Sequence, residues 1–306
     1  MGGGALVVEC DFGFLANPIK GDFLDVSITP LPNHSEILDA LKEVSHRDGF
    51  YYPPQTALYE VDFFSKDLKD KIERSERPAS VFFMPPSHHL SIQNPICTSG
   101  DKGTDTTLLI FLLAYLYGTR LMPSNWKFDG RVPIESVNNI YITTATTFDF
   151  LEQVYTWWKN LSEPLRVKFV NILYVFNRAR SLEWEWDIFM HQYMVFDSLY
   201  KLHLELQPHV TAKNQKNRFR ILCDAYSVFN EDLVDQIYKV RNNLVHEAVW
   251  LDSTIGFGSS DTNAYQLPFH LARLNTRIIA GISGYKNQYT RSPWWCMGTF
   301  SFDKKL

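Results

Sequence analysis

The feature that most constrains the fold is a change in hydrophobic period near residue 147. From there to about residue 282, apolar residues recur at every third or fourth position, which places them on one face of an α-helix. In the third of these segments, for example, Ile188, Val195 and Leu202 share one face. The links between segments are mostly short, so an up-and-down helical bundle is expected. The expected helices span residues 148–161, 164–179, 183–206, 215–227, 231–250 and 264–282.

The residues before this change have a different pattern. Short apolar or alternating runs are separated by turn-rich segments such as Tyr52-Pro53-Pro54 and Asn94-Pro95. Such runs predict strands, and two segments with helical periodicity lie among them. The expected strands span residues 5–14, 23–29, 57–64 and 80–84, and the expected helices span residues 35–45 and 105–117.

We therefore expect an α+β fold in three parts. A mixed α+β module covers residues 1–145, an all-helical bundle covers residues 146–285, and a tail covers residues 286–306. Residues 298–302 of the tail have the sequence Gly-Thr-Phe-Ser-Phe, which is typical of a strand. This strand is expected to pair back onto the first module.

Composition and charge narrow the possible functions. Of the 306 residues, 45% are hydrophobic and 21% are charged, which is typical of a chain with a packed core. The formal net charge of −4 argues against a protein that coats nucleic acid non-specifically, because such a protein needs a broad basic surface. The same charge is compatible with an enzyme that holds one or two phosphates in a local site.

The cysteines and the first residues indicate a cytoplasmic protein. Cys10, Cys97, Cys223 and Cys296 lie far apart and form no Cys-x-x-Cys pair, so free thiols in a reducing compartment are expected. The first residues lack the basic segment of a signal peptide. The most apolar run, residues 108–117, has half of the ~20 residues that a membrane-spanning helix needs, so no membrane association is expected.

Two adjacent histidines are the most obvious potential metal ligands. His88 and His89 could be combined with Cys97, but their spacing matches no known structural metal site. The neighbouring pair Pro85-Pro86 favours a surface loop at this point. We therefore expect no metal site and no cofactor.

Polar side chains gather on one flank of the helix expected at residues 231–250. Asn242 and His246 are four residues apart, so α-helical geometry stacks them on one face. Arg241 lies about 100° from Asn242 around the helix axis, and its side chain is long enough to reach Asn242 and His246. Tyr238 belongs to the stripe that contains Arg241 and is a candidate supporting residue.

These residue types suit cleavage of RNA at a phosphodiester with a neighbouring 2′-hydroxyl. Histidine titrates near neutrality, so His246 can take the 2′-hydroxyl proton or protonate the leaving oxygen. The guanidinium of Arg241 can hold the phosphate and stabilise the charge that develops on it, while Asn242 positions the ring or the ribose. No metal is needed, and the product would carry a 2′,3′-cyclic phosphate or a 3′-phosphate. The spacing alone also fits a capping histidine beside a solvated arginine.

The wider string, residues 233–247, has the sequence Leu-Val-Asp-Gln-Ile-Tyr-Lys-Val-Arg-Asn-Asn-Leu-Val-His-Glu. It resembles the signature helix of HEPN domains, especially the Apea-like group, in which an arginine and usually a polar residue such as asparagine precede a histidine. Arg241, Asn242 and His246 match this pattern position by position. The resemblance covers roughly residues 147–285.

The resemblance implies a helical bundle that forms a homodimer, with two motifs facing each other across the interface. It also implies a metal-independent endoribonuclease, since many members resemble RNases of phage defence or of toxin–antitoxin systems. The first module would then sense a trigger or restrain the nuclease, and a regulatory protein partner is possible. Other members are non-catalytic, so a scaffold that binds RNA, a nucleotide or a protein is the alternative.

Further residues are expected to support the motif. Family members often carry an acidic residue on an earlier helix, and Asp197 matches this description. It lies on one stripe with Met190, Tyr193, Met194 and Leu204. A carboxylate there needs a cationic partner, although at the bundle edge it could instead be hydrated. The basic residues 213–220 could follow an RNA backbone, or form a solvated loop and helix start. The expected RNA contacts are Lys213, Lys216, Arg218, Arg220 and Lys239.

Overall fold

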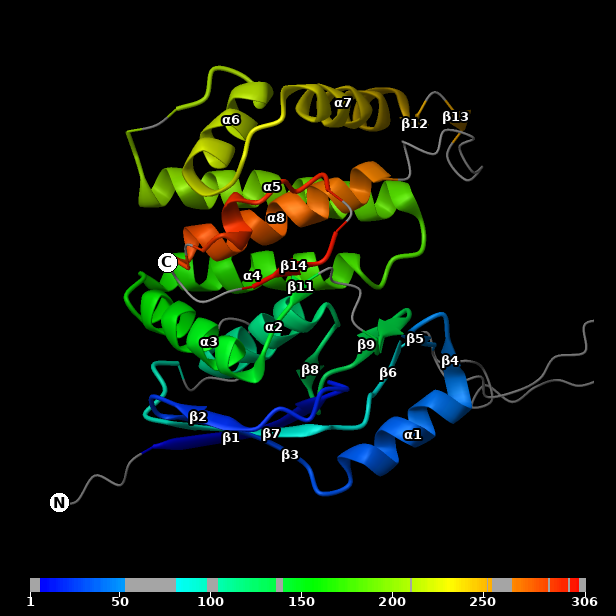
Figure 1. The fold of residues 1–306 in the computed structure, drawn as a ribbon, viewed down its shortest axis with the longest axis vertical. Coiled ribbons are helices and arrows are strands. Elements are labelled where there is room, and N and C mark those ends of the chain that lie inside the picture. Colours follow the sequence, from blue (N-terminus) through cyan, green and yellow to red (C-terminus); the bar gives the residue numbers. More distant parts are fainter. Residues whose placement is uncertain are drawn as a thin grey trace, which may run out of the picture.

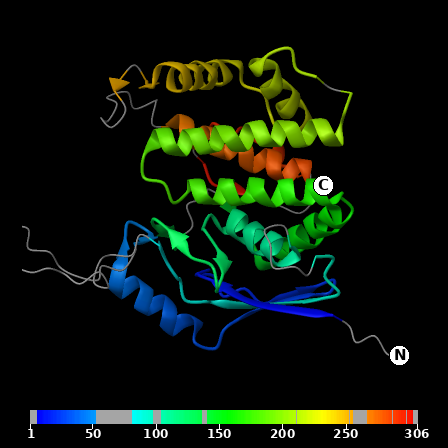
Figure 2. The same cartoon turned by 180° about the vertical axis from the view of Figure 1, so that it is seen from behind.

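The computed structural model describes most of the chain, and the strand expected at residues 57–64 lies outside the described residues. Figure 1 shows a layered arrangement, with a β-sheet at one end and successive layers of helices stacked above it. The view from behind in Figure 2 shows the same order of layers. The described residues are 6–52, 81–97, 104–135, 140–209, 211–251, 253–254, 266–285, 287–296 and 298–302.

The sheet has five strands in the order β2-β3-β7-β1-β8, and its neighbouring strands are antiparallel. At its centre, β1 pairs with β7 from Val7 opposite Gln93 to Phe12 opposite His88. Side chains on the inward face, such as Leu90, are fully buried and form part of the main core. The strands are β1 at Val7–Gly13, β2 at Gly21–Phe23, β3 at Val26–Pro30, β7 at His88–Gln93 and β8 at Met122–Pro123.

The expectation of a surface loop at His88 and His89 is wrong, because both residues lie in the central strand β7. His88 is completely buried, and its Nδ1 is 2.9 Å from the hydroxyl of Ser87. Burial lowers the pKa of His88 to about 3, so the ring is neutral inside the protein. His89 points to the other face and lies 2.7 Å from a carboxylate oxygen of Asp11. The strand continues through these histidines because their side chains alternate between the two faces.

A smaller buried cluster lies beside the sheet, under helix α1 and several two-residue strands. Leu41 of α1, Phe14, Phe82 and Phe128 belong to this cluster. Helix α1 confirms the helix expected at residues 35–45. The elements are α1 at His34–Ser45, β4 at His46–Arg47, β5 at Phe50–Tyr51, β6 at Val81–Phe82, β9 at Phe128–Asp129 and β10 at Val132–Pro133.

The remaining layers are helical. Helix α4 packs against α5, and α5 packs against α8. Helices α6 and α7 form the outermost layer, at the end of the molecule opposite the sheet (Figure 1). The described residues contain eight α-helices together with short strands, so the mixed α+β class is confirmed. The bundle helices are α3 at Thr144–Lys159, α4 at Glu163–Ala179, α5 at Glu185–Leu206, α6 at Gln215–Tyr226, α7 at Glu231–Asn242 and α8 at Leu267–Ile282.

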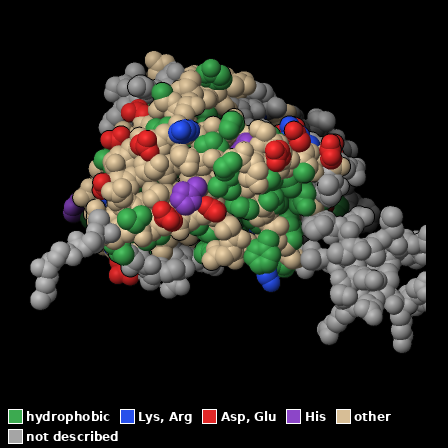
Figure 3. All heavy atoms as spheres, turned by 90° about the horizontal axis from the view of Figure 1, so that it is seen from below, with side chains coloured by type: hydrophobic (Ala, Val, Ile, Leu, Met, Phe, Trp, Pro, Cys, Tyr) green, Lys and Arg blue, Asp and Glu red, His purple; other side chains and the backbone are tan. Residues whose placement is uncertain are grey.

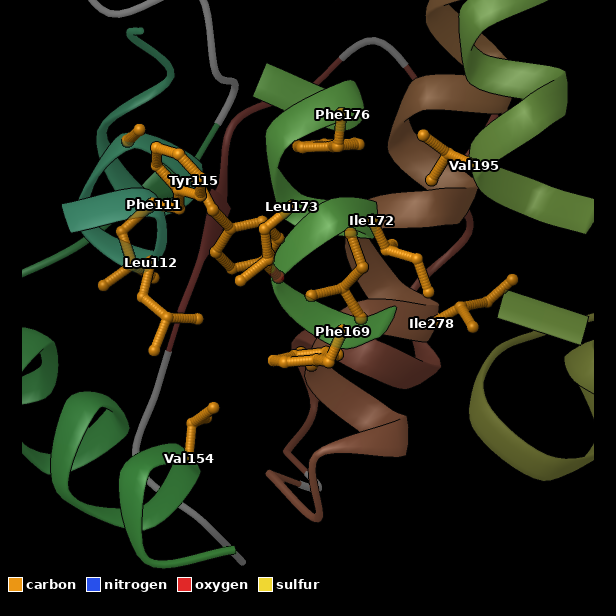
Figure 4. Close-up of a cluster of buried hydrophobic side chains, with 14 of the residues drawn as sticks. Phe111, Leu112, Tyr115, Val154, Phe169, Ile172, Leu173, Phe176, Val195 and Ile278 are labelled. Carbon is orange, nitrogen blue, oxygen red and sulfur yellow. The ribbon is translucent and has the colours of Figure 1, made fainter. Parts of the chain in front are cut away.

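Helix α2, at Asp105–Tyr117, connects the sheet to these helices and confirms the helix expected there. Thr104 caps its N-terminus by accepting a hydrogen bond from the Thr107 N–H at 3.3 Å, and Gly118 ends it in a left-handed conformation. A helix that is apolar all round needs neighbours on every side. The sheet covers one side of α2. On another side, the ring of Phe176 in α4 lies 5.8 Å from that of Tyr115 in α2 (Figure 4).

One buried cluster runs through the whole molecule and joins the N-terminal module to the bundle. It extends from Phe12 in the sheet to Val240 in α7 and Phe302 in the tail. In the tail, β14 (Phe300–Ser301) pairs in parallel with β11 (Ile140–Tyr141). The change of sequence pattern near residue 145 therefore does not interrupt the core.

The face of the sheet that points away from the helices is seen in Figure 3. Hydrophobic side chains gather on part of this face, and acidic side chains are scattered around them. The lysine and arginine side chains drawn there are few and do not form a patch that could follow a nucleic acid backbone. Among the described helices, none combines the length and the apolar character that crossing a membrane requires.

Candidate active site

The motif helix ends earlier than expected. Helix α7 begins after Asn230, whose side chain accepts a hydrogen bond from the Leu233 N–H at 3.1 Å. It ends at Asn242 and continues as a single π-helical turn at Asn243–Glu247, so the expectation of one helix over residues 231–250 is wrong. Single π-helical turns of this kind occur frequently at functional sites.

Ala248 closes the π-helical turn. Its backbone has a left-handed conformation with φ of 54°, and its N–H donates to the carbonyl of Asn243, five residues earlier. The chain then reverses into a hairpin of β12 (Val249–Trp250) and β13 (Ser253–Thr254). This reversal buries Trp250, whose ring lies 5.4 Å from that of Phe189 in α5. A helix that continued to residue 250 would lose this packing.

The π-helical turn brings Arg241 and His246 together. Nη1 of Arg241 lies 3.3 Å from Nε2 of His246 and 3.1 Å from Oδ1 of Asn242. The expected stacking of Asn242 on His246 assumed α-helical geometry through residue 246, which the protein does not have. The guanidinium of Arg241 instead contacts both Asn242 and His246, so the three predicted side chains lie together.

The surroundings leave the chemistry-bearing atoms accessible. His246 is exposed, while Arg241 is half-buried, with its Nε enclosed and its guanidinium 5.6 Å from the centre of the Tyr193 ring. Because a guanidinium only donates hydrogen bonds, Nε2 of His246 must accept one. This direction of the hydrogen bond requires the imidazole tautomer that carries its proton on Nδ1.

The strained backbone at Ala248 gives a test of the turn. Glycine adopts this conformation freely, so Ala248→Gly is expected to stabilise the protein by up to about 1 kcal/mol. A β-branched side chain fits the conformation poorly, so Ala248→Val is expected to destabilise it by about 1 kcal/mol or more. Urea unfolding measures both changes. As a control, Ala40→Gly at an exposed position of α1 is expected to destabilise by about 0.5–1 kcal/mol. Equal losses at Ala248 and Ala40 would contradict the left-handed conformation.

Asp197, expected to support the motif, has a cationic partner, and that partner is Arg218 of α6. A carboxylate oxygen of Asp197 lies 2.9 Å from Nη1 of Arg218. Tyr193 lies between this pair and the motif, since its ring faces Arg241 and its electrostatic neighbours include Asp197. Burial and the negative charge of Asp197 raise the pKa of Tyr193 to about 12. The sequence analysis placed Tyr193 on the stripe of Asp197 but gave it no role at the site, although a residue four positions before Asp197 lies next to it on a helix.

Ion pairs within the protein involve Lys216, Arg218 and Arg220, which were among the expected RNA contacts. The amine of Lys216 lies 2.8 Å from Asp235 and 3.1 Å from Glu231, and Arg218 is held by Asp197. Arg220 lies 3.9 Å from Glu231. Exposed ion pairs of this type contribute little to stability, so phosphates can compete for these cations.

The other expected residues lie at the surface around the motif. Lys213 precedes α6 and is exposed, and Lys239 is exposed on α7. Tyr238 is 39% exposed and Val245 is 44% exposed, so the motif lies beside accessible apolar surface. Among the described residues, no group of His, Cys, Asp or Glu side chains is arranged to hold a metal ion.

Comparisons with protein-family models, curated protein sequences and solved structures gave no significant match.

Proposed function

We propose that the protein is a metal-independent endoribonuclease whose active site consists of Arg241, Asn242 and His246. The observation that carries the proposal is the 3.3 Å contact between Nη1 of Arg241 and Nε2 of the exposed His246. A fixed cation beside an accessible imidazole is the pair that phosphodiester cleavage next to a 2′-hydroxyl needs.

The resting contact also explains how the site would be activated. Phosphate oxygens accept hydrogen bonds from a guanidinium more strongly than an imidazole does, so RNA draws Arg241 away from Nε2. The freed Nε2 takes the 2′-hydroxyl proton, and the 2′-oxygen attacks phosphorus as the bond to the 5′-oxygen breaks. A proton returned to the 5′-oxygen completes the step. The products are a 2′,3′-cyclic phosphate, which can be hydrolysed to a 3′-phosphate, and a 5′-hydroxyl.

A homodimer is part of this proposal. One histidine cannot accept and donate a proton on opposite sides of the phosphorus at once, whereas a second copy of the motif could supply the other proton transfer. The exposed side chains of Tyr238 and Val245 support an interface beside the motif, since apolar surface next to a polar site is typical of association surfaces. Sedimentation of the purified protein measures whether the dimer forms.

The proposal is tested by cleavage of single-stranded RNA in EDTA. The wild type is expected to cut and to leave a 2′,3′-cyclic phosphate or 3′-phosphate opposite a 5′-hydroxyl. Arg241→Gln is expected to slow cleavage by about 10²–10³-fold, because the charge on the phosphate loses its main stabilising group. Lys201→Gln removes one exposed positive charge of α5 and is expected to leave the rate unchanged. Loss of wild-type cleavage in EDTA, or equal rates in the two variants, would contradict the mechanism.

A scaffold that binds RNA, a nucleotide or a protein without cutting is the second candidate. The ion pairs of Lys216 and Arg218 favour it, since they reduce the positive charge available to hold a substrate. Binding of labelled RNA without cleavage, lost in Arg241→Gln, would support this candidate. Cells that express the wild type or the variant and are challenged with phage would then test a role in defence.

A further inference from the structure

A cavity of about 380 Å³ lies on the other side of α5 from the motif. It is lined by α4, α5 and α8 together with residues of the β11–β14 pair, which lies over α4 in Figure 1. Its volume falls within the range of about 300–1,000 Å³ that is usual for small-molecule sites. The residues come from distant parts of the chain, from Phe50 to Phe300.

The walls of the cavity are mostly apolar. Phe176, Ile188 and Phe300 line its interior, and Phe269, which is 49% exposed, lines it at the surface. Such walls favour a ligand with an apolar or aromatic body, because removing apolar surface from water lowers the free energy.

The polar part of the lining is strongly basic. It contains four arginines and two glutamates, so the formal charge of the lining is positive. One of the glutamates, Glu183, is exposed to solvent, where its charge is screened. The six residues are Arg131, Arg180, Glu183, Glu185, Arg273 and Arg277.

Arg277 is the most informative of these residues, because only 1% of it is exposed. Its guanidinium donates to the hydroxyl of Ser292 at 2.8 Å, to the carbonyl of Ser292 at 2.9 Å and to the carbonyl of Arg273 at 2.9 Å. Its remaining partners, the carbonyl of Pro293 and the hydroxyl of Tyr289, are neutral as well. These bonds satisfy its donors but leave a full positive charge inside the protein, and burial lowers its pKa.

Arg180 adds a second cation to the same lining. Its guanidinium donates to the carbonyls of Ala114 at 2.7 Å and Tyr115 at 3.3 Å, at the C-terminal end of α2. Burial lowers the pKa of Arg180 to about 9, because its charged guanidinium loses contact with water. The negative end of the α2 helix dipole offsets part of the free-energy cost of desolvating this guanidinium. A bound anion would stabilise both guanidinium groups further.

We propose that this cavity binds a small organic anion, with its phosphate or carboxylate among the arginines and its apolar body between Phe176, Ile188, Phe269 and Phe300. The ligand is nucleotide-like or fatty-acid-like, since both classes join an oxyanion to a body that fits such walls. The site is distinct from the motif and does not depend on its activity.

Calorimetric titration of the whole protein with AMP and, separately, with decanoate tests the proposal. One of the two probes is expected to bind with one site per chain, and the probe that binds identifies the class. Arg273→Gln is expected to weaken that binding by roughly tenfold or more, since hydrogen bonds to charged groups are worth at least that factor. Arg178→Gln removes an arginine paired with Asp129, outside the cavity lining, and is expected to leave the affinity unchanged.

A second variant, at the surface of the cavity, tests binding without disturbing the fold. Phe269→Asp replaces a half-exposed side chain at the surface of the cavity and adds a negative charge there, so it is expected to fold and to lose binding. The melting temperature of each variant without ligand checks that it is folded. Failure of both probes to bind at millimolar concentration would overturn the proposal. Binding that neither Arg273→Gln nor Phe269→Asp weakens would do the same.

Discussion

Replacing His246 with alanine is expected to slow RNA cleavage by about 10²–10⁴-fold, the usual contribution of a general acid or base. The side chain is exposed, and the hydrogen bond it forms joins it to Arg241. The substitution should therefore leave the folding free energy almost unchanged while removing the group that takes the 2′-hydroxyl proton. Single-turnover cleavage of a labelled RNA in EDTA measures the effect.

His209→Ala is the matched control for this variant. His209 is also exposed, but it follows the C-terminal end of α5, whereas the hairpin after the motif packs near the N-terminal end of that helix. Cleavage by His209→Ala at the wild-type rate, with loss in His246→Ala, would place His246 in the active site. Unchanged cleavage by His246→Ala would exclude it from the mechanism.

Replacing Phe150 with alanine is expected to lower the free energy of unfolding by about 3–5 kcal/mol. Phe150 is completely buried in α3, and its ring meets aromatic rings from three separate parts of the chain. The ring centres lie 5.7 Å away for Tyr115 of α2, 5.0 Å for Tyr285 and 5.3 Å for Phe302. Loss of this ring would leave a cavity where the N-terminal module, the bundle and the tail meet.

Urea unfolding followed by fluorescence and by circular dichroism measures this loss of free energy. It also tests whether the sheet and the helices unfold in one transition. The two signals are expected to change together in the wild type, because one buried cluster joins the sheet to the helices. Phe269→Ala, at a half-exposed position, is expected to cost about 1 kcal/mol or less. A comparable cost at both positions, or separate transitions for the two signals, would contradict this description of the core.

The periodic part of the sequence predicted the fold well. Helices α2 to α6 and α8 lie within a few residues of the expected segments, because their apolar stripes are long and have cap residues such as Thr104. The central strand β7 was missed, although the buried residues His88, Leu90 and Ile92 alternate with less buried ones. The preceding prolines and the polar side chains of the histidines outweighed that alternation.

The candidate site was predicted in its residues but not in its geometry. Arg241, Asn242 and His246 were identified from their spacing, whereas the π-helical turn depends on Ala248 and on the burial of Trp250 against α5. No local pattern encodes that tertiary contact. The ion pairs of α6 depend on the helix docking as well.

The arginine-lined cavity was not predicted because its lining is spread over the chain. Arg131 and Arg277, for example, are separated by most of the bundle in sequence and meet in space across α4, α5 and α8. Isolated arginines in a sequence are indistinguishable from solvated ones. Only the docked helices show that these arginines line one cavity.

On the ribosome, the parallel pairing of β11 with β14 sets the order in which the protein can fold. Ile140 is synthesised 160 positions before its partner Phe300. At ~5–20 residues per second, translation of that stretch takes roughly ten to thirty seconds. During this interval the aromatic surface around Phe150 lacks the cover that Phe302 provides. Chaperones that bind exposed apolar segments would therefore have time to bind a nascent chain whose sheet and first helices are synthesised but not yet covered by the C-terminal strand.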